Sequence, residues 1–387
     1  MHILEIPSFF PPYGGAFCLD QSKALAKQGN TVRIVACVQL GVTISKWKYL
    51  TAQTQCEEKE MEGITVLYRQ MHGLPMAPRM NMRRWVRTVC RMVDYYVDCY
   101  GKPDIIHAHC GKWAGYAAML LARQWNVPYV VTEHLSHLVF ATEFGNRPLE
   151  RIWQIPILKE VYRQTSLVIP VSAELVDDLA PYFGRDYRWT DVSNTIDTDF
   201  FAPVHRKPIQ NRPFVFCCLA MFIPLKGYDV LLDAFRELVE RKSSEVRLII
   251  AGTYTDSPAL ARMVEERGLK EVVEIRGLVD KVGVRGILYE SDCLVLASRS
   301  EAQPLVLCEA MSTGIPVIST EVVPRSLRLA GCHVVPIDDA HALFGMMCQV
   351  SDNYASVDGD KISEEVGLQV SPQAIGKRLT ELFQELL

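Results

Sequence analysis

The sequence predicts an α/β fold made of two parallel-sheet domains. Short apolar runs typical of buried strands alternate with longer amphipathic stretches, which is the pattern of parallel sheets covered by helices. The chain has 387 residues, too many for one ordinary core, since a domain usually holds about 100–200 residues. A polar, proline-bearing segment at 203–213 separates two runs of the pattern. We therefore expect an N-terminal domain over residues 1–200, a linker over 201–212 and a C-terminal domain over 213–370.

Each expected domain supplies its own strands and helices. The first domain is expected to have strands at 2–6, 31–38, 104–108, 128–132 and 167–171, with helices at 16–28, 113–125 and 173–182. The second is expected to have strands at 214–220, 246–251, 272–276, 293–297 and 315–319. A last helix at 371–387 has Ser371 as its cap, Pro372 in its first turn and one apolar side, so it needs a surface to cover.

Composition narrows the class of protein. The chain is 49% hydrophobic and 22% charged, as folded proteins are, and a net charge of -4 argues against a nucleic-acid partner. Twelve cysteines occur without a C-x-x-C spacing, which indicates reduced thiols rather than a zinc site or a disulfide framework. No basic start with an apolar run opens the chain, and no apolar stretch approaches the roughly 18 residues of a membrane span. We expect a cytoplasmic protein.

The segment 298–318 predicts a strand exit, a turn, a short helix and a new strand. Pro304 suits the first helical position, and Gly314 suits the left-handed residue just past the helix end. The free amides at the helix start would then be those of Leu305, Val306 and Leu307. Unpaired N–H groups and the positive end of the helix dipole bind anions, so we expect an anion here.

Two carboxylates flank this helix start. Glu301 stands just before the helix and Glu309 about one turn inside it. Carboxylates beside a bound phosphate are suited to hold sugar hydroxyls. The Glu-x7-Glu spacing, followed by Ala-Met-x-x-Gly-x-Pro-Val, resembles the hallmark of glycosyltransferase family 4.

The resemblance implies the GT-B fold, an α/β arrangement of two Rossmann-like parallel-sheet domains facing across a cleft, with helix 371–387 packing back on the first domain. It implies that Glu301 holds the donor sugar, Glu309 binds the ribose hydroxyls, and the amides of Leu305 and Val306 bind the diphosphate. The expected reaction moves a hexose-type sugar from a nucleotide-diphosphate sugar to a glycan or lipid-linked acceptor, with retention of configuration. Cell-surface polysaccharide synthesis is the expected setting.

Motifs of the first half follow in the order of the same family. Gly14 and Gly15, after the first strand, resemble its glycine loop, where backbone amides approach the donor. His109 ends a strand and resembles a histidine facing the cleft, and His134 resembles the active-site histidine that approaches the donor hexose. Asn194, in Asn-Thr-Ile-Asp, resembles the family's Asn-Gly-x-Asp, so His109 and Asn194 are expected on the acceptor side.

Motifs of the second half complete the comparison. Residues 219–227 resemble a Gly-Arg-Leu-x-x-x-Lys-Gly block in which Arg and Lys clamp the diphosphate. Lys226 is present, but Met221 replaces the arginine, so Arg276 or Arg299 is a candidate substitute for its charge. The nucleobase is expected against a strand end formed by Gly277, Leu278 and Val279. His134, Glu301 and Lys226 are the expected catalytic residues.

Two short patterns resemble metal ligands. His107 and His109 form a His-x-His pair, for which the sequence shows no third ligand nearby, and the family has a similar non-metal motif. Asp197 and Asp199 match the Asp-x-Asp of metal-dependent transferases but lie just before the linker. We expect no metal and no cofactor besides the nucleotide-sugar co-substrate, with Lys226 and the helix start neutralising the diphosphate.

Basic residues gather on one predicted helix. Arginines at 79, 83, 87 and 91 repeat every four residues, with Arg84 beside them and apolar residues between. This stripe (Arg79, Arg83, Arg84, Arg87 and Arg91) fits an anionic membrane surface at the inner face of the cell membrane, a phosphate-linked acceptor, or simply a solvated helix face.

Two other functions fit the same sequence. A sugar-nucleotide epimerase of the GT-B fold would need no second substrate. A degenerate transferase that binds glycans or nucleotides without catalysis is favoured by Met221. Product analysis with the donor alone separates the first from a transferase, and nucleotide binding without hydrolysis or transfer would indicate the second.

Overall fold

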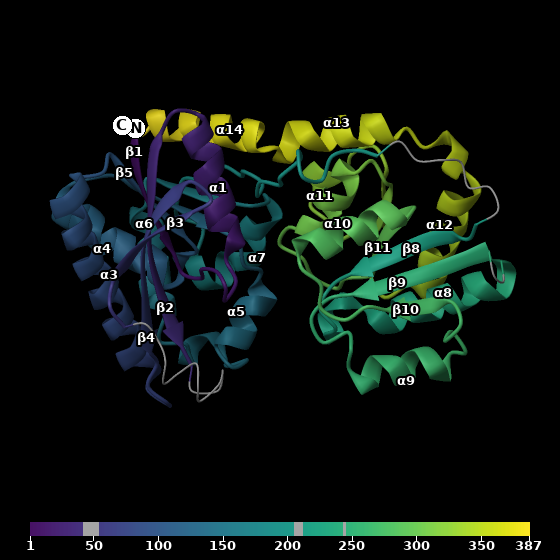
Figure 1. Ribbon diagram of the computed structural model, residues 1–387. Coiled ribbons are helices and arrows are strands. Elements are labelled where there is room, and N and C mark those ends of the chain that lie inside the picture. The colour runs from purple at the N-terminus through teal and green to yellow at the C-terminus, as the bar shows by residue number, and fades with distance from the viewer. Residues whose placement is uncertain (42–53, 205–211, 243–244) are drawn as a thin grey trace. The chain divides into compact units, whose positions relative to one another are not determined.

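The computed structural model describes residues 1–41, 54–204, 212–242 and 245–387 (Figure 1). The chain divides into two compact units, Met1–Thr195 with Pro372–Leu387, and Ile196–Ser371. The division falls after Thr195 rather than at residue 200. Residues 205–211 of the expected linker lie outside the described residues.

The first unit is built on a seven-stranded sheet with the order β3-β4-β2-β1-β5-β6-β7. All its strand pairs are parallel except the β3–β4 hairpin. This hairpin was not among the expected elements, although Glu62 and Gly63, both with positive φ, form its turn. The strands are β1 (His2–Pro7), β2 (Thr31–Leu40), β3 (Glu57–Met61), β4 (Ile64–His72), β5 (Ile105–His109), β6 (Tyr129–Glu133) and β7 (Leu167–Pro170).

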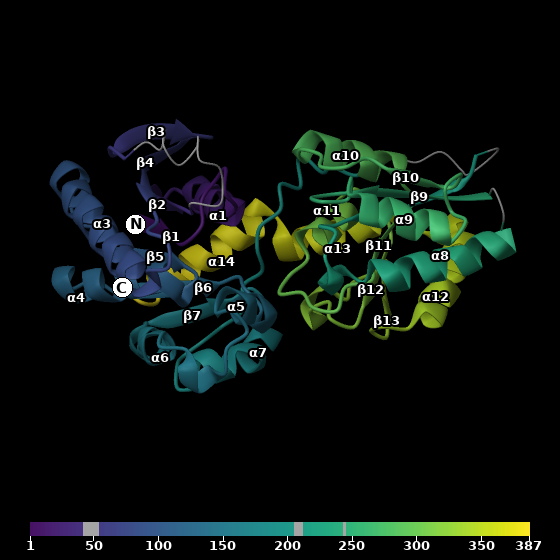
Figure 2. The same cartoon turned by 90° about the horizontal axis from the view of Figure 1, so that it is seen from below.

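Helices cover both faces of this sheet. On one face lie α1 and α14, and on the other α3 and α4 (Figure 2). The expected helix at 113–125 begins at Tyr116, because the backbone before it is kinked: Lys112 is extended, with ψ 131°, and Trp113 has a positive φ of 57°. The helices are α1 (Ala16–Lys27), α3 (Pro78–Tyr100), α4 (Tyr116–Trp125), α5 (His137–Glu143), α6 (Ile155–Gln164), α7 (Glu174–Phe183) and α14 (Pro372–Gln384).

The C-terminal helix is part of the first unit's core. Ile375, Leu379 and Phe383 of α14 are buried against Leu25 and the sheet. Gly376 permits this packing, since a Cβ added there would lie 2.3 Å from the carbonyl oxygen of Ala24 in α1. The apolar side expected for residues 371–387 is therefore the side that α14 buries.

The second unit is built on a six-stranded parallel sheet with the order β10-β9-β8-β11-β12-β13. Its last strand was not among those expected. The strands are β8 (Phe214–Leu219), β9 (Val246–Ala251), β10 (Val273–Ile275), β11 (Cys293–Leu296), β12 (Val317–Thr320) and β13 (Cys332–Val335). The helices are α8 (Tyr228–Lys242), α9 (Pro258–Glu266), α10 (Lys281–Glu290), α11 (Leu305–Ser312), α12 (Ala340–Asp352) and α13 (Gly359–Val370).

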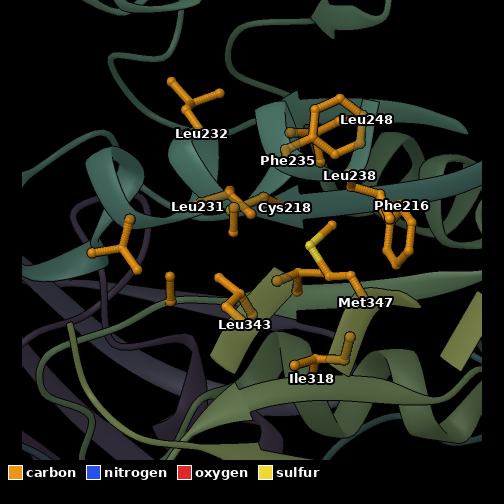
Figure 3. Packing of buried hydrophobic residues seen from close by; sticks show 14 of the residues in the cluster. Phe216, Cys218, Leu231, Leu232, Phe235, Leu238, Leu248, Ile318, Leu343 and Met347 are labelled. Carbon is orange, nitrogen blue, oxygen red and sulfur yellow. The ribbon is translucent and has the colours of Figure 1, made fainter. Parts of the chain in front are cut away.

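Alternate strand residues of the second unit feed two cores. Phe216 and Cys218 pack with α8, α9 and α12, where Phe235 and Met347 lie (Figure 3). Cys217 points to the opposite face, which α10, α11 and α13 cover. This two-sided burial explains the continuous apolar strands, which are typical of parallel sheets. Among the described residues no helix combines the length and apolar character needed to cross a bilayer.

Candidate functional site

Among the parallel strands of each unit, the strand order reverses once. In the second unit the reversal lies between β8 and β11, and in the first between β1 and β5. Ligands of open parallel sheets bind outside the carboxyl ends of the strands at such a switch point. The residues that follow these four strands are therefore the first candidates for a site.

The loop after β8 brings Lys226 to the switch point of the second unit. Pro224–Lys226 form a 3-10 turn, and Gly227 follows with φ 62°. A Cβ on Gly227 would lie 2.0 Å from the carbonyl oxygen of Ala297, just past β11. The absence of a side chain at Gly227 therefore lets the Lys226 turn pack directly against the end of the neighbouring strand.

Lys226 meets Glu301 there. The Lys226 Nζ lies 2.5 Å from Glu301 Oε1, and the Ser298 hydroxyl donates to the same oxygen at 2.7 Å. The Lys226 side chain is 22% exposed and that of Glu301 10%. The two residues that were expected to act together on the donor are thus in contact, with part of their surface open to a ligand.

The helix after Glu301 starts one residue later than expected. Pro304 is the N-cap, with extended backbone, and α11 begins at Leu305. The amide of Leu307 donates to the Pro304 carbonyl oxygen at 3.1 Å, so it is not free as expected. The backbone N–H groups of Leu305 and Val306 have no acceptor among the described residues. These two N–H groups are the anion-binding donors that the helix start offers.

The far end of α11 also agrees with the sequence. Glu309 lies one turn into the helix and is half-buried. Gly314 follows the helix with φ 82°, as expected for a left-handed residue. A Cβ on Gly314 would meet the Gly359 carbonyl oxygen at 2.9 Å, so this glycine also sets how closely α13 approaches.

Neither proposed substitute for the missing arginine is uncommitted. Arg276 pairs with Glu274 and Glu290, at 2.7 Å each. Arg299 pairs with Asp229 at 2.7 Å and Asp338 at 2.6 Å, and it also donates to the Pro224 carbonyl oxygen. Arg299 therefore stabilises the turn that holds Lys226. Met221 itself is 41% exposed.

The nucleobase segment follows β10. Gly277 has φ 66°, and its carbonyl oxygen accepts from the amide of Gly252 at the end of β9. Leu278 is 73% exposed. Asp280 then caps α10 by accepting from the Gly283 amide. Gly277, Leu278 and Val279 thus follow β10 at the carboxyl edge of the sheet, with Gly277 buried, Leu278 exposed and Val279 partly buried.

In the first unit the glycine loop lies at the end of β1. Gly14 and Gly15 have φ 96° and 75°, and α1 begins directly after them. A Cβ on Gly15 would lie 2.0 Å from the carbonyl oxygen of Phe9. Glycine is therefore required at position 15, whereas at Gly14 only the backbone angle favours it.

A chain of buried polar side chains crosses β1, β5 and β6. Glu5 Oε2 lies 2.7 Å from His109 Nε2 and 2.9 Å from His107 Nδ1. His109 Nδ1 lies 3.0 Å from His134 Nε2. We call Glu5, His109 and His134 the histidine chain. Glu5 and His109 are fully buried, while His134 is 7% exposed and stacks on the ring of Phe17.

Hydrogen bonding fixes the tautomers along the histidine chain. Burial alone would raise the pKa of Glu5, but His107 and His109 outweigh it and hold the pKa below its usual range. Glu5 is then an acceptor, so the His109 nitrogen facing it carries the hydrogen. Burial and the charge of His107 lower the pKa of His109 to about 4, so His109 is neutral at pH 7 and its Nδ1 accepts from His134.

His134 therefore offers an acceptor nitrogen. Burial, followed by the charges of His109 and His107, lowers its pKa well below the usual value, although Asn194 acts in the opposite direction. With its hydrogen on Nε2, the ring presents an unprotonated Nδ1, which has no hydrogen-bond partner among the described residues. Such an atom can accept a hydrogen bond from a sugar hydroxyl.

His109 differs from its expected place. It was expected to face a ligand, but its ring has no exposed surface, and both ring nitrogens are bound. His109 thus positions His134 rather than touching a substrate. Asn194, also expected on the acceptor side, is 4% exposed and lies near His134.

Sequence reasoning missed Glu5, the third group beside the His-x-His pair. Glu5, His107 and His109 offer ligand atoms close enough together to hold a metal ion. In the structure these atoms are hydrogen-bonded to one another, and His107 Nε2 also binds the Thr132 hydroxyl at 2.7 Å. The available signal was a carboxylate in the middle of a predicted buried strand, where an unpaired charge is costly.

Asp197 belongs to a different contact. Its carboxylate accepts from the amide of Phe200 and lies 3.5 Å from Lys281 Nζ. These bonds close the turn that opens the second unit. They give Asp197 a structural role that does not depend on a metal.

Comparison with known proteins agrees with this architecture. Sucrose-phosphate synthase from Thermosynechococcus elongatus superposes with a TM-score of 0.78 at 19% identity, covering 100% of this chain and 99% of that one. Anabaena HepE, solved in complex with UDP, gives 0.71 at 17% identity over the full length of both. Two doubly wound parallel sheets with candidate residues at their switch points define the class: the fold is GT-B, as expected.

Sequence comparison gives the family. The model of glycosyltransferase family 4 matches residues 14–200, and that of glycosyl transferases group 1 matches residues 212–353. The chain belongs to glycosyltransferase family 4. A D-inositol 3-phosphate glycosyltransferase from Paenarthrobacter aurescens is 30% identical over 255 residues, 62% of each chain, so the match spans less than two thirds of that relative. One from Corynebacterium urealyticum is 28% identical over 313 residues, 73% of this chain and 72% of the relative.

Proposed function

We propose that this protein transfers a hexose-type sugar from a nucleoside-diphosphate sugar to a hydroxyl of a glycan or lipid-linked acceptor, with retention of configuration. The observation that carries the proposal is the contact of Lys226 with Glu301 beside the start of α11. Family membership and the GT-B fold support it.

The proposed donor contacts follow from charge. A diphosphate leaving group gains negative charge as the sugar departs, and preorganised donors in a partly dry site stabilise that charge. Lys226 and the amides of Leu305 and Val306 are such donors. Glu301, freed from Lys226 by the competing diphosphate, would accept from sugar hydroxyls, and Glu309 would accept from the ribose.

The first unit would supply His134. Its unprotonated Nδ1 would accept a hydrogen bond from a hydroxyl of the donor hexose, which orients the sugar for attack. Retention would then follow from attack of the acceptor hydroxyl on the face the diphosphate leaves, with a departing phosphate oxygen taking the acceptor's proton. This balances the reaction: the new C–O bond replaces the bond to the diphosphate, and the proton ends on the phosphate.

We further propose that the reaction needs no metal ion. Lys226 and the α11 terminus would provide the positive charge that other transferases take from a divalent cation. Transfer that persists in excess EDTA would support this, and transfer restored only by added Mg²⁺ or Mn²⁺ would contradict it.

The donor and the setting can be narrowed by analogy. HepE was solved with UDP and with UDP-glucose, so uridine nucleotides are the first donors to test here. All twelve cysteines are thiols, which persist in reducing compartments. We therefore propose action on the cytoplasmic side of a membrane, where a lipid-linked acceptor of surface polysaccharide would be available.

The central experiment compares donor binding with turnover. Replacing Lys226 or Glu309 by Ala should weaken UDP-glucose binding, for Lys226 by about 10–100-fold, the value of one charge-assisted hydrogen bond. His134→Ala should mainly lower kcat. Lys361→Ala is the matched control, since Lys361 is an exposed lysine on α13 of the same unit. Equal affinity and turnover in all the variants would contradict the assignments.

Met221 favours one second candidate, a nucleotide-binding protein without transferase activity. With Arg276 and Arg299 both paired to carboxylates, the diphosphate meets one cation fewer than in the family motif. Measurable UDP affinity without either hydrolysis or transfer of the donor sugar would favour this reading. Conversion of the donor into an epimer, without an acceptor, would instead identify an epimerase.

A further inference from the structure

A hollow of about 380 Å³ lies in the first unit between the end of β4 and the helix α3. Its wall includes four arginines, Arg69 from β4 and Arg84, Arg87 and Arg91 from α3, together with His72 and Thr88. None of the described residues that line it is acidic. We call the four arginines the arginine pocket.

The arginine pocket divides the predicted basic stripe. Three arginines of α3 line the hollow, and two of them, Arg87 and Arg91, are also exposed. Arg83 is not part of the lining, and the Arg79 guanidinium lies over the Trp153 ring at 5.4 Å. Arg69 was not part of the stripe and comes from a strand that the sequence analysis missed. The strand thus adds a fourth cation to three that share a helix face.

The charges of the arginine pocket are not neutralised within the described part of the chain. None of the four forms an ion pair there, in contrast with Arg276 and Arg299, which each pair with two carboxylates. The Nε of Arg69 is buried without an acceptor among the described residues. The Arg84 guanidinium donates to the His72 carbonyl oxygen at 3.0 Å, which fixes it across the hollow.

We propose that the arginine pocket binds a phosphate group. Guanidinium groups present paired N–H donors that match phosphate oxygens, and the match is bidentate and charge-assisted. Four positive charges around one hollow suit a multiply charged oxyanion better than a single carboxylate. A buried N–H without an acceptor is costly, and a phosphate oxygen would satisfy it.

The position of the pocket suits a ligand of the first unit. Arg69 and His72 lie near the C-terminal end of β4. Strand β4 is parallel to β2, which is parallel to β1. The pocket therefore shares the carboxyl edge of the sheet with the glycine loop. The phosphate can belong to a soluble phosphorylated molecule or to a lipid headgroup.

Titration with inorganic pyrophosphate tests the site. The Lys226→Ala protein is used, because it lacks the lysine proposed to hold the donor diphosphate. In that background Arg87→Gln with Arg91→Gln should weaken pyrophosphate binding at least tenfold. Arg79→Gln with Arg83→Gln is the matched control, with the same charge change and spacing on the same helix, and should change the affinity less than twofold.

Two results would overturn the proposal. One is equal weakening by the two double variants, which would indicate general surface charge. The other is absence of pyrophosphate binding to the Lys226→Ala protein. UDP binding to the double variants with Lys226 intact should equal wild type, so failure of the donor site and failure of the arginine pocket are distinguishable.

Vesicles then identify the source of the phosphate. If sedimentation with phosphatidic acid in phosphatidylcholine is lost in the Arg87/Arg91 variant and competed by pyrophosphate, the pocket takes a lipid-borne phosphate. If pyrophosphate binds while those vesicles do not retain the protein, the pocket takes a soluble phosphorylated ligand. Either result supports the phosphate site.

Discussion

Glu5 determines, through His109, the tautomer of His134, the residue proposed to meet the sugar. As a carboxylate, Glu5 accepts hydrogen bonds from His107 and His109. Because His109 donates to Glu5 through Nε2, its Nδ1 is left to accept a hydrogen bond from His134. A glutamine there could accept with one oxygen, and its amide would be a donor facing a nitrogen that now donates. One histidine would have to change tautomer.

We predict that Glu5→Gln lowers kcat roughly tenfold, within the range expected for one hydrogen bond to a charged group. The KM for the donor should change little, because the contacts proposed for the donor's nucleotide and diphosphate are all with residues of the second unit. Steady-state kinetics of UDP-sugar transfer measures both values. Glu143→Gln, which removes a carboxylate paired with Lys112 in the same unit, is the control. A Glu5→Gln enzyme with wild-type kcat would show that the histidine chain is dispensable.

At this scale the sequence predicted residues that lie in local motifs. Lys226 and Glu301 are 75 residues apart, yet each was found because it follows a strand in a short pattern. Glu5 is 104 residues from His109, and its only local signal, a carboxylate inside a predicted buried strand, does not indicate its partners. Its partners are chosen by strand order, which brings β1 beside β5, and a single sequence does not display that adjacency.

The short turn of Pro224–Lys226 depends on its following glycine. Gly227 has a left-handed φ. The backbone carbonyl of Ala297 occupies the space that a side chain at position 227 would need. A substitution must therefore move either the turn or the end of β11. Both movements displace Lys226 from Glu301.

We predict that Gly227→Ala lowers the free energy of unfolding by about 1–3 kcal/mol through backbone strain and weakens UDP binding by more than tenfold. Thermal unfolding and isothermal titration measure the two effects. Gly345→Ala in α12 is the control, because a Cβ there meets nothing within 4 Å. It should be neutral or stabilising by up to about 1 kcal/mol. Unchanged UDP affinity in Gly227→Ala would contradict the role given to the turn.

Most strands with a strong apolar run were predicted, but β4 was missed although its segment 64–68 is mostly apolar and mostly buried. The strands β1, β2, β8 and β9 are mostly apolar and largely buried, with Glu5 in β1, Arg33 in β2 and Arg247 in β9 as charged exceptions. The edge strand β3 is mostly exposed, and β13 is half-buried. Neither strand is a continuous buried apolar run, so neither was predicted. The arginine pocket needed β4, which is why the sequence showed a basic stripe but not a hollow.

On the scale of the molecule, buried neutral histidines make the first unit sensitive to acid. His109 and His134 have lowered pKa values in the folded state and ordinary values, near 6.5, when unfolded. Below pH 6.5 the unfolded chain therefore binds more protons than the folded one, and stability falls as the pH falls toward the folded pKa. Each such histidine contributes a slope of about 1.4 kcal/mol per pH unit in that window.

We predict that His134→Asn reduces the slope of the free energy of unfolding against pH by about 1.4 kcal/mol per pH unit between pH 6 and 5. Urea unfolding followed by tryptophan fluorescence is the measurement, since all six tryptophans precede residue 195 and report on the first unit. The raised pKa of Glu133 acts in the opposite direction but is common to both proteins. Identical slopes for the two would show that His134 is protonated to the same extent in the folded and unfolded chains.

The return of α14 to the first unit has a consequence for biosynthesis. A ribosome produces residues 196–371 before the segment that covers Leu25 and its neighbours. The second unit can therefore reach its native form while the first still exposes an apolar strip to chaperones. Nascent chains arrested before Pro372 should be proteolysed in their N-terminal half, although that half left the tunnel earliest.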